Sequence, residues 1–219
     1  MLWKNVLAVL LSYGLGCLVS GYYLVRWKTG QDIRTIGSGS AGARNVGRLL
    51  GRWGFWAVLA ADILRGAAAS SAAWALGVST PVKTLCILAA AVGHILPIQL
   101  DFRGGKGLGV SLGALLVFDW RIAVGSFLVC AVLYFLSRRY MLSGMIAVLT
   151  VPAVSFLLGL PRSATGILFV WASLILLAHR KNLIALCAGK NRSEGDGAYG
   201  DGKNHDRNSD RRIHIQDCQ

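Results

Sequence analysis

Long apolar stretches alternate with short basic ones along the first 180 residues of the chain. An α-helix needs about 20 apolar residues to cross a hydrocarbon core about 30 Å thick. Most of the apolar stretches reach or approach that length, and the fourth is short enough to form a tilted or half-buried helix. The pattern predicts membrane-spanning helices near residues 3–25, 53–78, 81–100, 107–119, 121–137, 141–160 and 162–178.

Basic residues between these stretches predict the orientation of the chain. The connections on one side carry only single charges (Lys4, Lys83, Arg121 and Arg162). Because Lys and Arg concentrate in cytoplasmic loops, the richer side should be cytoplasmic. We therefore expect an all-α polytopic membrane protein, a seven-span helix bundle with its N-terminus outside and its C-terminus cytoplasmic. The richer connections hold Arg26, Lys28, Arg34, Arg44, Arg48, Arg52, Arg103, Lys106, Arg138, Arg139, Arg180 and Lys181.

Composition supports the membrane class and divides the chain in two. Of its 219 residues, 54% are hydrophobic and only 15% are charged, unlike an ordinary soluble domain. We expect a membrane domain over residues 1–190 and a polar tail over 191–219, too poor in apolar side chains to fold alone. Residues after Gly189 are charge-balanced, so the net charge of +13 lies in the membrane part. The positive-inside bias explains this charge without a nucleic-acid partner.

The segment "GSGSAGARNVGR", residues 37–48, is rich in hydrogen-bond donors and poor in acceptors. It holds four glycines, two serines, Asn45, and the pair Arg44 and Arg48. Backbone N–H groups and hydroxyls suit phosphate oxygens, and guanidinium groups bind them through charge-assisted pairs. The segment is therefore a candidate phosphate-binding loop. The alternative is an ordinary Gly/Ser-rich connection.

A second segment, "GHILPIQLDFRGGKG" at residues 93–107, ends in a glycine turn around Lys106. Glycines allow positive φ or a close backbone approach, and successive N–H groups in such a turn can bind an anion. His94 lies near the end of a predicted span, where an ionisable group is costly enough to be a functional candidate. The alternatives are a flexible connector and a structural histidine.

Two further features carry polar side chains to the same side. Residues 178–191 place His179, Arg180 and Asn182 directly after the last span, which a basic flank would also explain. Within the second span, Asp62 and Arg65 stand three residues apart and share a helix face. They form either part of the site or a neutral structural clamp.

These segments resemble the motif regions of the PlsY family, the bacterial membrane glycerol-3-phosphate acyltransferases that use acyl-phosphate. The resemblance covers about residues 1–190, and its most specific part is the second region. The matching residues are Ser38, Gly39, Gly42, Ala43, Asn45 and Arg48; Asp62 and Gly66, with Arg65 for a lysine; Gly93, His94, Pro97, Phe102, Gly104, Gly105, Lys106 and Gly107; and His179, Arg180, Asn182, Leu186 and Gly189.

The resemblance implies a function at the cytoplasmic face of the bacterial inner membrane. A fatty acyl chain would pass from acyl-phosphate to the hydroxyl of glycerol 3-phosphate, giving lysophosphatidic acid. The implied partners are the lipid bilayer, the acyl-phosphate donor and a small phosphorylated acceptor; no cofactor and no metal are expected. We expect Lys106 and Ser38 to act in catalysis, and the base to be His94, His179 or the substrate's own phosphate. Expected binding residues are Arg48, Asn45, Gly39, Gly42, Gly104, Gly105, Gly107, Arg180, Asn182, Asp62 and Arg65.

The chain departs from the family pattern at several positions, of which Ser40 and Arg44 bear most directly on the acceptor, and Gln99 replaces a phenylalanine. Ser40 replaces an asparagine, Arg44 a threonine, Ala185 an arginine and Asn191 a glutamate. Ser40 and Arg44 make the first loop more positive and roomier, which favours a more anionic or bulkier acceptor. Glycerol 3-phosphate stays the primary prediction. The alternatives are acyl transfer to a different small acceptor, an anion transporter and an inactive membrane scaffold.

Overall fold

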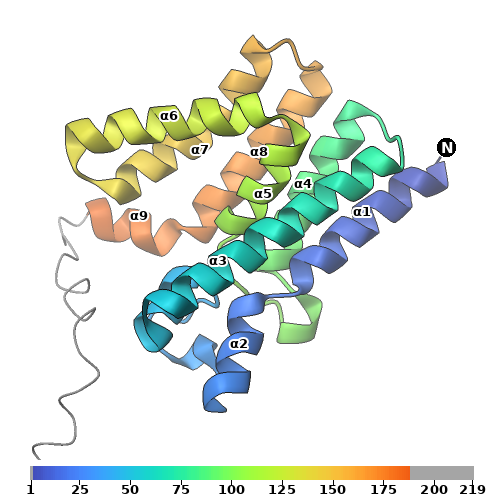
Figure 1. The fold of residues 1–219 in the computed structure, drawn as a ribbon. Helices are drawn as coiled ribbons and strands as arrows, with labels where there is room; N and C mark the ends of the chain where they lie inside the picture. The colour runs from blue at the N-terminus through green and yellow to red at the C-terminus, as the bar shows by residue number, and fades with distance from the viewer. Residues whose placement is uncertain (1, 188–219) are drawn as a thin grey trace, which may run out of the picture.

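The computed structural model describes residues 2–187, apart from the side chains of residues 140, 182 and 185–187. The predicted tail, residues 191–219, lies outside the described residues. The described chain is helical throughout (Figure 1): α1 Leu2–Cys17, α2 Ser20–Thr29, α3 Ala43–Ala75, α4 Thr80–Ile95, α5 Leu108–Phe118, α6 Trp120–Ser137, α7 Tyr140–Leu157, α8 Arg162–Ala178 and α9 Arg180–Cys187, with 3₁₀ turns η1 Ile33–Thr35 and η2 Ile98–Leu100. The predicted all-α class is confirmed.

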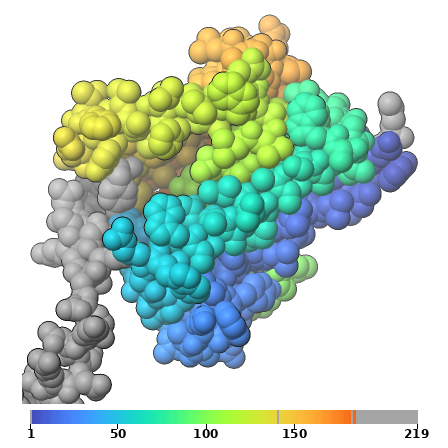
Figure 2. All heavy atoms as spheres, viewed as in Figure 1, coloured from blue at the N-terminus to red at the C-terminus, as the bar shows by residue number. Residues whose placement is uncertain are grey.

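Helix α4 lies at the centre of the bundle, in contact with α1, α3, α5 and α8. The hairpin of α6 and α7 packs on α5 and α8 and projects to one side (Figure 1). Between α6 and α3, α5 reaches the surface (Figure 2), where Leu108, Leu112 and Leu116 are each about 40% exposed. Their spacing of four residues places these leucines on one helix face. This face is an apolar surface of the kind that lipid covers.

Glycines let the central helices approach closely. A Cβ on Gly66 of α3 would overlap the backbone of Val110 in α5, and one on Gly113 of α5 would overlap the backbone of Ile63. Gly16 of α1 is packed against α4 in the same way. Small residues at such contacts let membrane helices associate through backbone packing. The connection from α4 to α5, residues 96–107, therefore starts and ends on tightly held helices.

The first two predicted helices differ from those observed. Residues 3–25 were expected as one helix, but α1 ends at Cys17 and α2 begins at Ser20. The Gln99 side chain donates a hydrogen bond to the carbonyl of Cys17 at this break. Helix α3 begins ten residues before the predicted start at 53, and Gly51 interrupts it with a φ of 76°. The end of the predicted phosphate-binding loop is thus a short helix, because the segment from Ala43 to Leu50 is helical.

The helices fit a membrane protein in length and composition. Within the described chain, three segments are long and apolar enough to span a bilayer: Leu2–Thr29, Thr80–Leu100 and Trp120–Ser137. Three shorter apolar helices cover Leu108–Phe118, Met141–Leu157 and Arg162–Ala178. Helix α3, with 33 residues, is longer than a span requires and carries arginines and an aspartate. The short fourth span predicted at 107–119 corresponds to α5.

Candidate active site

The first loop is shaped from within by Asn45. Its Oδ1 accepts a hydrogen bond from the Ser38 N–H at 3.0 Å, and its Nδ2 donates to the carbonyls of Ile36 at 2.9 Å and Ser40 at 3.0 Å. Asn45 is only 3% exposed, so its amide holds the loop together instead of facing a ligand. The side chain of Ser38, by contrast, is exposed. Gly39, with a φ of 71°, lets the loop turn beside it, and Gly42 precedes the first residue of α3.

Arg44 and Arg48 follow on the short helical segment before Gly51. Residues four apart lie on the same helix face, so these two guanidinium groups project from one side of α3. Arg48 is exposed and Arg44 is half-buried. The segment therefore presents two cations, one turn apart, directly after the loop that exposes Ser38.

The glycine turn uses both properties of glycine, positive φ and close backbone approach. Only Gly107, with a φ of 79°, has left-handed backbone. Gly104 and Gly105 are required by close approach, because a Cβ on either would overlap atoms of His94. The carbonyl of Gly104 also accepts a hydrogen bond from the Ala41 N–H at 3.3 Å. The first loop and the glycine turn are thus in direct contact.

Lys106 lies in this turn among other cations. Burial lowers the pKa of its ammonium, and Arg44, Arg48 and Lys181 lower the pKa further. The carboxylates of the described chain pair with arginines elsewhere: Asp32 and Asp101 with Arg34, Asp62 with Arg65, and Asp119 with Arg121. A cluster of positive side chains around a glycine turn is suited to phosphate groups.

His179 brings the third segment to the same place. Its Nδ1 lies 2.8 Å from the carbonyl of Ile175; since a carbonyl can only accept, the neutral ring has its hydrogen on Nδ1 and a lone pair on Nε2. Burial lowers the pKa of His179, and the charge of Lys106 lowers it further. Helix α8 is fixed to α5 by a hydrogen bond from Trp171 Nε1 to Ser111 Oγ, 2.9 Å long.

Residues of α9 complete this side of the cluster. Arg180 and Lys181 are exposed, while the side chain of Asn182 lies outside the described residues. Lys181 was not among the predicted site residues. In the sequence, Lys181 is explained as part of a basic flank after a span. Its proximity to Lys106 follows from the packing of α8.

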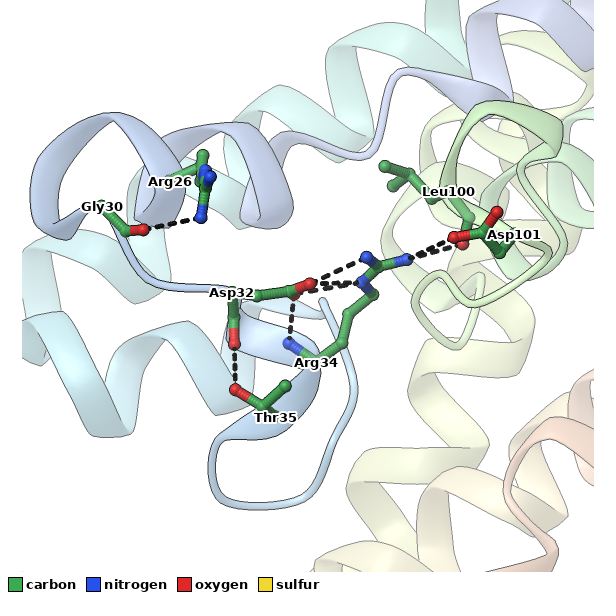
Figure 3. A network of polar contacts seen from close by, with 7 residues as sticks. All are labelled: Arg26, Gly30, Asp32, Arg34, Thr35, Leu100 and Asp101. Atoms are coloured by element: carbon green, nitrogen blue, oxygen red, sulfur yellow. Dashed lines mark hydrogen bonds and ion pairs between the residues drawn. The ribbon is translucent and has the colours of Figure 1, made fainter.

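Arg34 joins η1, the turn that precedes the first loop, to the connection between α4 and α5 (Figure 3). It pairs with Asp32 at 2.8 Å, donates from Nη1 to the carbonyl of Leu100 at 2.7 Å, and lies 3.8 Å from a carboxylate oxygen of Asp101. Asp101 and Phe102 both have left-handed backbone, with φ of 53° and 58°, a conformation that non-glycine residues keep only when their surroundings impose it. The sequence interpretation did not single out Arg34 as a residue of the site.

Asp62, Arg65 and His94 lie beneath the glycine turn. Asp62 is 3% and His94 2% exposed, and Arg65 pairs with Asp62. Asp62 and His94 therefore lie in the interior, whereas Arg48 and Lys181 near Lys106 are exposed. For Asp62 and Arg65, burial favours the structural clamp over a place in the site. Ser20 of α2 also belongs to this buried group, since its Oγ donates to Asp62 Oδ1 at 2.7 Å.

The sequence model of the family described as "Glycerol-3-phosphate acyltransferase" matches residues 6–189. The chain belongs to the glycerol-3-phosphate acyltransferase family. The "Glycerol-3-phosphate acyltransferase 1" of Desulfitobacterium hafniense (strain Y51) is 40% identical over 179 residues, 82% of this chain and 89% of that protein. The "Glycerol-3-phosphate acyltransferase" of Synechococcus sp. (strain JA-2-3B'a(2-13)) is 39% identical over 184 residues, 84% of this chain and 92% of that protein.

Solved structures agree with this family assignment. The crystal structure of PlsY (YgiH), an integral membrane glycerol 3-phosphate acyltransferase, in its glycerol 3-phosphate form has a TM-score of 0.77 and 31% identity, covering 84% of this chain and 92% of that chain. Its lysophosphatidic acid form has a TM-score of 0.74 and 30% identity over the same shares. The resemblance inferred from the motifs is confirmed, and the chain is an acyltransferase of a bacterial membrane family.

Proposed function

We propose that this chain transfers a fatty acyl group from acyl-phosphate to the hydroxyl of glycerol 3-phosphate, producing lysophosphatidic acid and inorganic phosphate. The observation that carries the proposal is the convergence of Arg44, Arg48 and Lys181 on Lys106 within a glycine turn. Both substrates carry a phosphate group, which such a cluster attracts. The names of the relatives supply the acceptor.

The reaction needs positioning and positive charge more than a covalent intermediate. The acceptor oxygen bonds to the acyl carbon, the bond from that carbon to the phosphate oxygen breaks, and phosphate leaves with the electron pair. Negative charge grows on the carbonyl oxygen and on the leaving phosphate. Fixed cations and N–H donors at these atoms stabilise the transition state. Holding both substrates in the reactive orientation supplies the rest of the rate enhancement.

The roles of the residues follow from their positions. Lys106 and Arg48 neutralise phosphate, and the exposed hydroxyl of Ser38 donates to a substrate oxygen. The N–H groups of Gly104 and Gly105 already donate to the carbonyls of Ile95 and His94. Arg180 and Asn182 contribute from α9. The acceptor's proton passes to His179 Nε2 or to the acceptor's own phosphate. A His179→Ala variant that keeps the acidic limb of the pH profile of kcat/KM assigns the base to the phosphate; loss of that limb assigns it to His179.

The location follows from the charge distribution. We place the seven crossing segments in α1 with α2, and in α3 through α8, with the N-terminus outside and the C-terminus in the cytoplasm. The cation cluster, which includes basic residues of three separate connections, then faces the cytoplasm at the bacterial inner membrane. There a water-soluble acceptor meets a donor whose acyl chain lies in lipid.

The test is acyl transfer by the purified full chain in detergent, with a long-chain acyl-phosphate and labelled glycerol 3-phosphate. Lys106→Ala should lower kcat/KM at least about a hundredfold, the scale of losing one transition-state donor. Lys83→Ala, which removes a lysine at the other end of the bundle, is the control and should leave the rate unchanged. Full activity in Lys106→Ala, or transfer from acyl-coenzyme A alone, would refute the proposal.

A further inference from the structure

A buried polar cluster lies beneath the glycine turn and is built from Ser20 of α2, Asp62 and Arg65 of α3, and His94 of α4. Asp62 Oδ1 accepts from Ser20 Oγ at 2.7 Å and pairs with Arg65 Nη2, which also lies 3.1 Å from Ser20 Oγ. Arg65 Nε donates to the carbonyl of Ala61 at 3.1 Å. The side chains of Asp62 and Arg65 are 5% and 13% exposed. Buried charges of this kind persist when they are paired and hydrogen-bonded.

His94 lies between this cluster and the turn. Its Nε2 is 3.8 Å from Asp62 Oδ2, and its carbonyl accepts from the Gly105 N–H at 2.9 Å. A Cβ on Gly105 would overlap His94 Nε2, and one on Gly104 would overlap the His94 carbonyl. The turn that carries Lys106 therefore rests directly on the imidazole and backbone of His94.

The same contacts close His94 off from a substrate. The residue is 2% exposed, and its Nδ1 is a buried polar atom without a hydrogen-bond partner among residues 2–187. Gly105 and Asp62 cover Nε2 from two sides. A general base must come within hydrogen-bond reach of the proton that it accepts, and a residue that is only 2% exposed does not offer that reach.

We propose that His94 is a positioning residue rather than the base: it supports the glycine turn, and the Ser20–Asp62–Arg65 group holds it in place. This inference rests on the proposed function, because the turn matters through the phosphate that Lys106 holds. Removing the imidazole should weaken the binding of glycerol 3-phosphate. KM for that substrate should rise about tenfold while kcat changes less than about threefold, a pattern of lost binding rather than lost chemistry.

The decisive experiment is a double-mutant cycle between His94→Ala and Gly105→Ala on the purified full chain. Gly105→Ala alone should lower kcat/KM for glycerol 3-phosphate about a hundredfold, because its methyl group displaces the turn from the imidazole. In the His94→Ala background, Gly105→Ala should lower kcat/KM by a factor at least about tenfold smaller than in the wild type, as expected for two residues in contact. Gly14→Ala is the matched control, since a Cβ there meets nothing within 4 Å, and it should have no effect.

A base and a support give different results in this cycle. The proposal is overturned if His94→Ala lowers kcat at least about a hundredfold with unchanged KM and removes the acidic limb of the pH profile from the residual activity. It is also overturned if Gly105→Ala costs the same factor in both backgrounds. If His94→Ala does not fold, His94→Asn replaces it, because the shorter side chain also makes room and the expectations are the same.

The proposed function can fail separately. If the wild type transfers no acyl group from acyl-phosphate to glycerol 3-phosphate, that function is refuted. The support by His94 is then tested with inorganic phosphate as the probe, in isothermal titration calorimetry of the same four proteins. Coupling between the two substitutions in phosphate affinity supports the positioning role, and independent effects contradict it.

Discussion

At the scale of single residues, the environment of Lys106 determines how the site responds to pH. Burial and three cationic neighbours disfavour its charged form, so the free enzyme loses the ammonium charge at a lower pH than an exposed lysine would. Binding of a phosphate dianion opposes this loss, because an opposite charge stabilises the protonated form. The pH dependence should therefore be clearer in kcat/KM, which reports the free enzyme, than in kcat.

Replacing Lys106 by arginine should move the alkaline limit of activity. A guanidinium stays protonated over the whole working range, so the fall of kcat/KM for glycerol 3-phosphate on the alkaline side should shift to higher pH in Lys106→Arg. The absolute rate should fall, because arginine is longer. Profiles of kcat/KM against pH, each normalised to its maximum, test this. An alkaline limb at the same pH in both proteins would mean that Lys106 does not titrate there.

We expect Arg44 to affect the choice of acceptor. It lies on the same face of α3 as Arg48 and close enough to Lys106 to lower its pKa, so it adds a cation to the site that the family pattern lacks. Arg44→Thr with Ser40→Asn restores that pattern. The double variant should lower kcat/KM for a doubly phosphorylated short alcohol, relative to glycerol 3-phosphate, by about tenfold or more. Competition between the two acceptors measures this ratio, and an unchanged ratio would place Arg44 outside the acceptor subsite.

At the scale of helices and loops, the local sequence pattern predicted the apolar helices. The helix break and the roles of polar side chains depend on contacts between residues far apart in the sequence. The break between α1 and α2 lies inside a continuous apolar run, and the residue after it, Ser20, bonds Asp62, 42 positions away. Asn45 has the chemistry of a phosphate ligand, but its amide is used by backbone groups of its own loop. Spacing along the chain indicated which residues were polar and functional. It could not tell which of them face a substrate and which support the turn below it.

Arg34 offers a test of how loops position the site. Arg34→Met should raise KM for glycerol 3-phosphate about tenfold, because the left-handed backbone at Asp101 and Phe102 loses its support. Arg121→Met is a matched control: Arg121 pairs with Asp119 two residues away at 2.8 Å, the same spacing as Arg34 with Asp32, but outside the candidate site. Steady-state kinetics of both variants test the prediction, and equal changes in KM would contradict it.

The same substitution should change stability in a pH-dependent way. Hydrogen bonding by Arg34 lowers the pKa of Asp32 in the folded protein. A lowered pKa stabilises the fold above the unfolded-state value of about 4, and this contribution is lost as pH falls through the folded-state pKa. Arg34→Met should therefore cost about 1–3 kcal/mol at neutral pH and less below about pH 4. The free energy of unfolding of both proteins in detergent, measured across pH, tests this. A difference between them that does not change with pH would show that the Asp32 pair is not its cause.

At the scale of the whole molecule, the residues that we assign to the site precede the polar tail in the sequence. The cations, the glycine turn, His94 and His179 all lie between residues 38 and 181. The tail is charge-balanced and poor in apolar side chains. Deleting residues 192–219 should leave membrane insertion and kcat/KM within about twofold of wild type. Activity of the truncated chain in membranes, at matched expression, tests this. A large loss of turnover would show that the tail contributes to the site.

The topology determines whether the three motif segments can work together. Lys106 lies in the connection after α4, and the cations around it come from the first turns of α3 and from α9, so these three segments must emerge on one side of the bilayer. The proposed seven crossing segments would place the two ends on opposite sides, and the clustered basic residues predict that the motif side is cytoplasmic. A reporter fused after residue 182 should read cytoplasmic, and one fused before Lys4 should read external. A further reporter between α4 and α5, after Phe102, should match the first. Finding the two ends on one side would eliminate the seven-span arrangement, while a mismatch between residues 102 and 182 would separate His179 from the glycine turn and contradict the site itself.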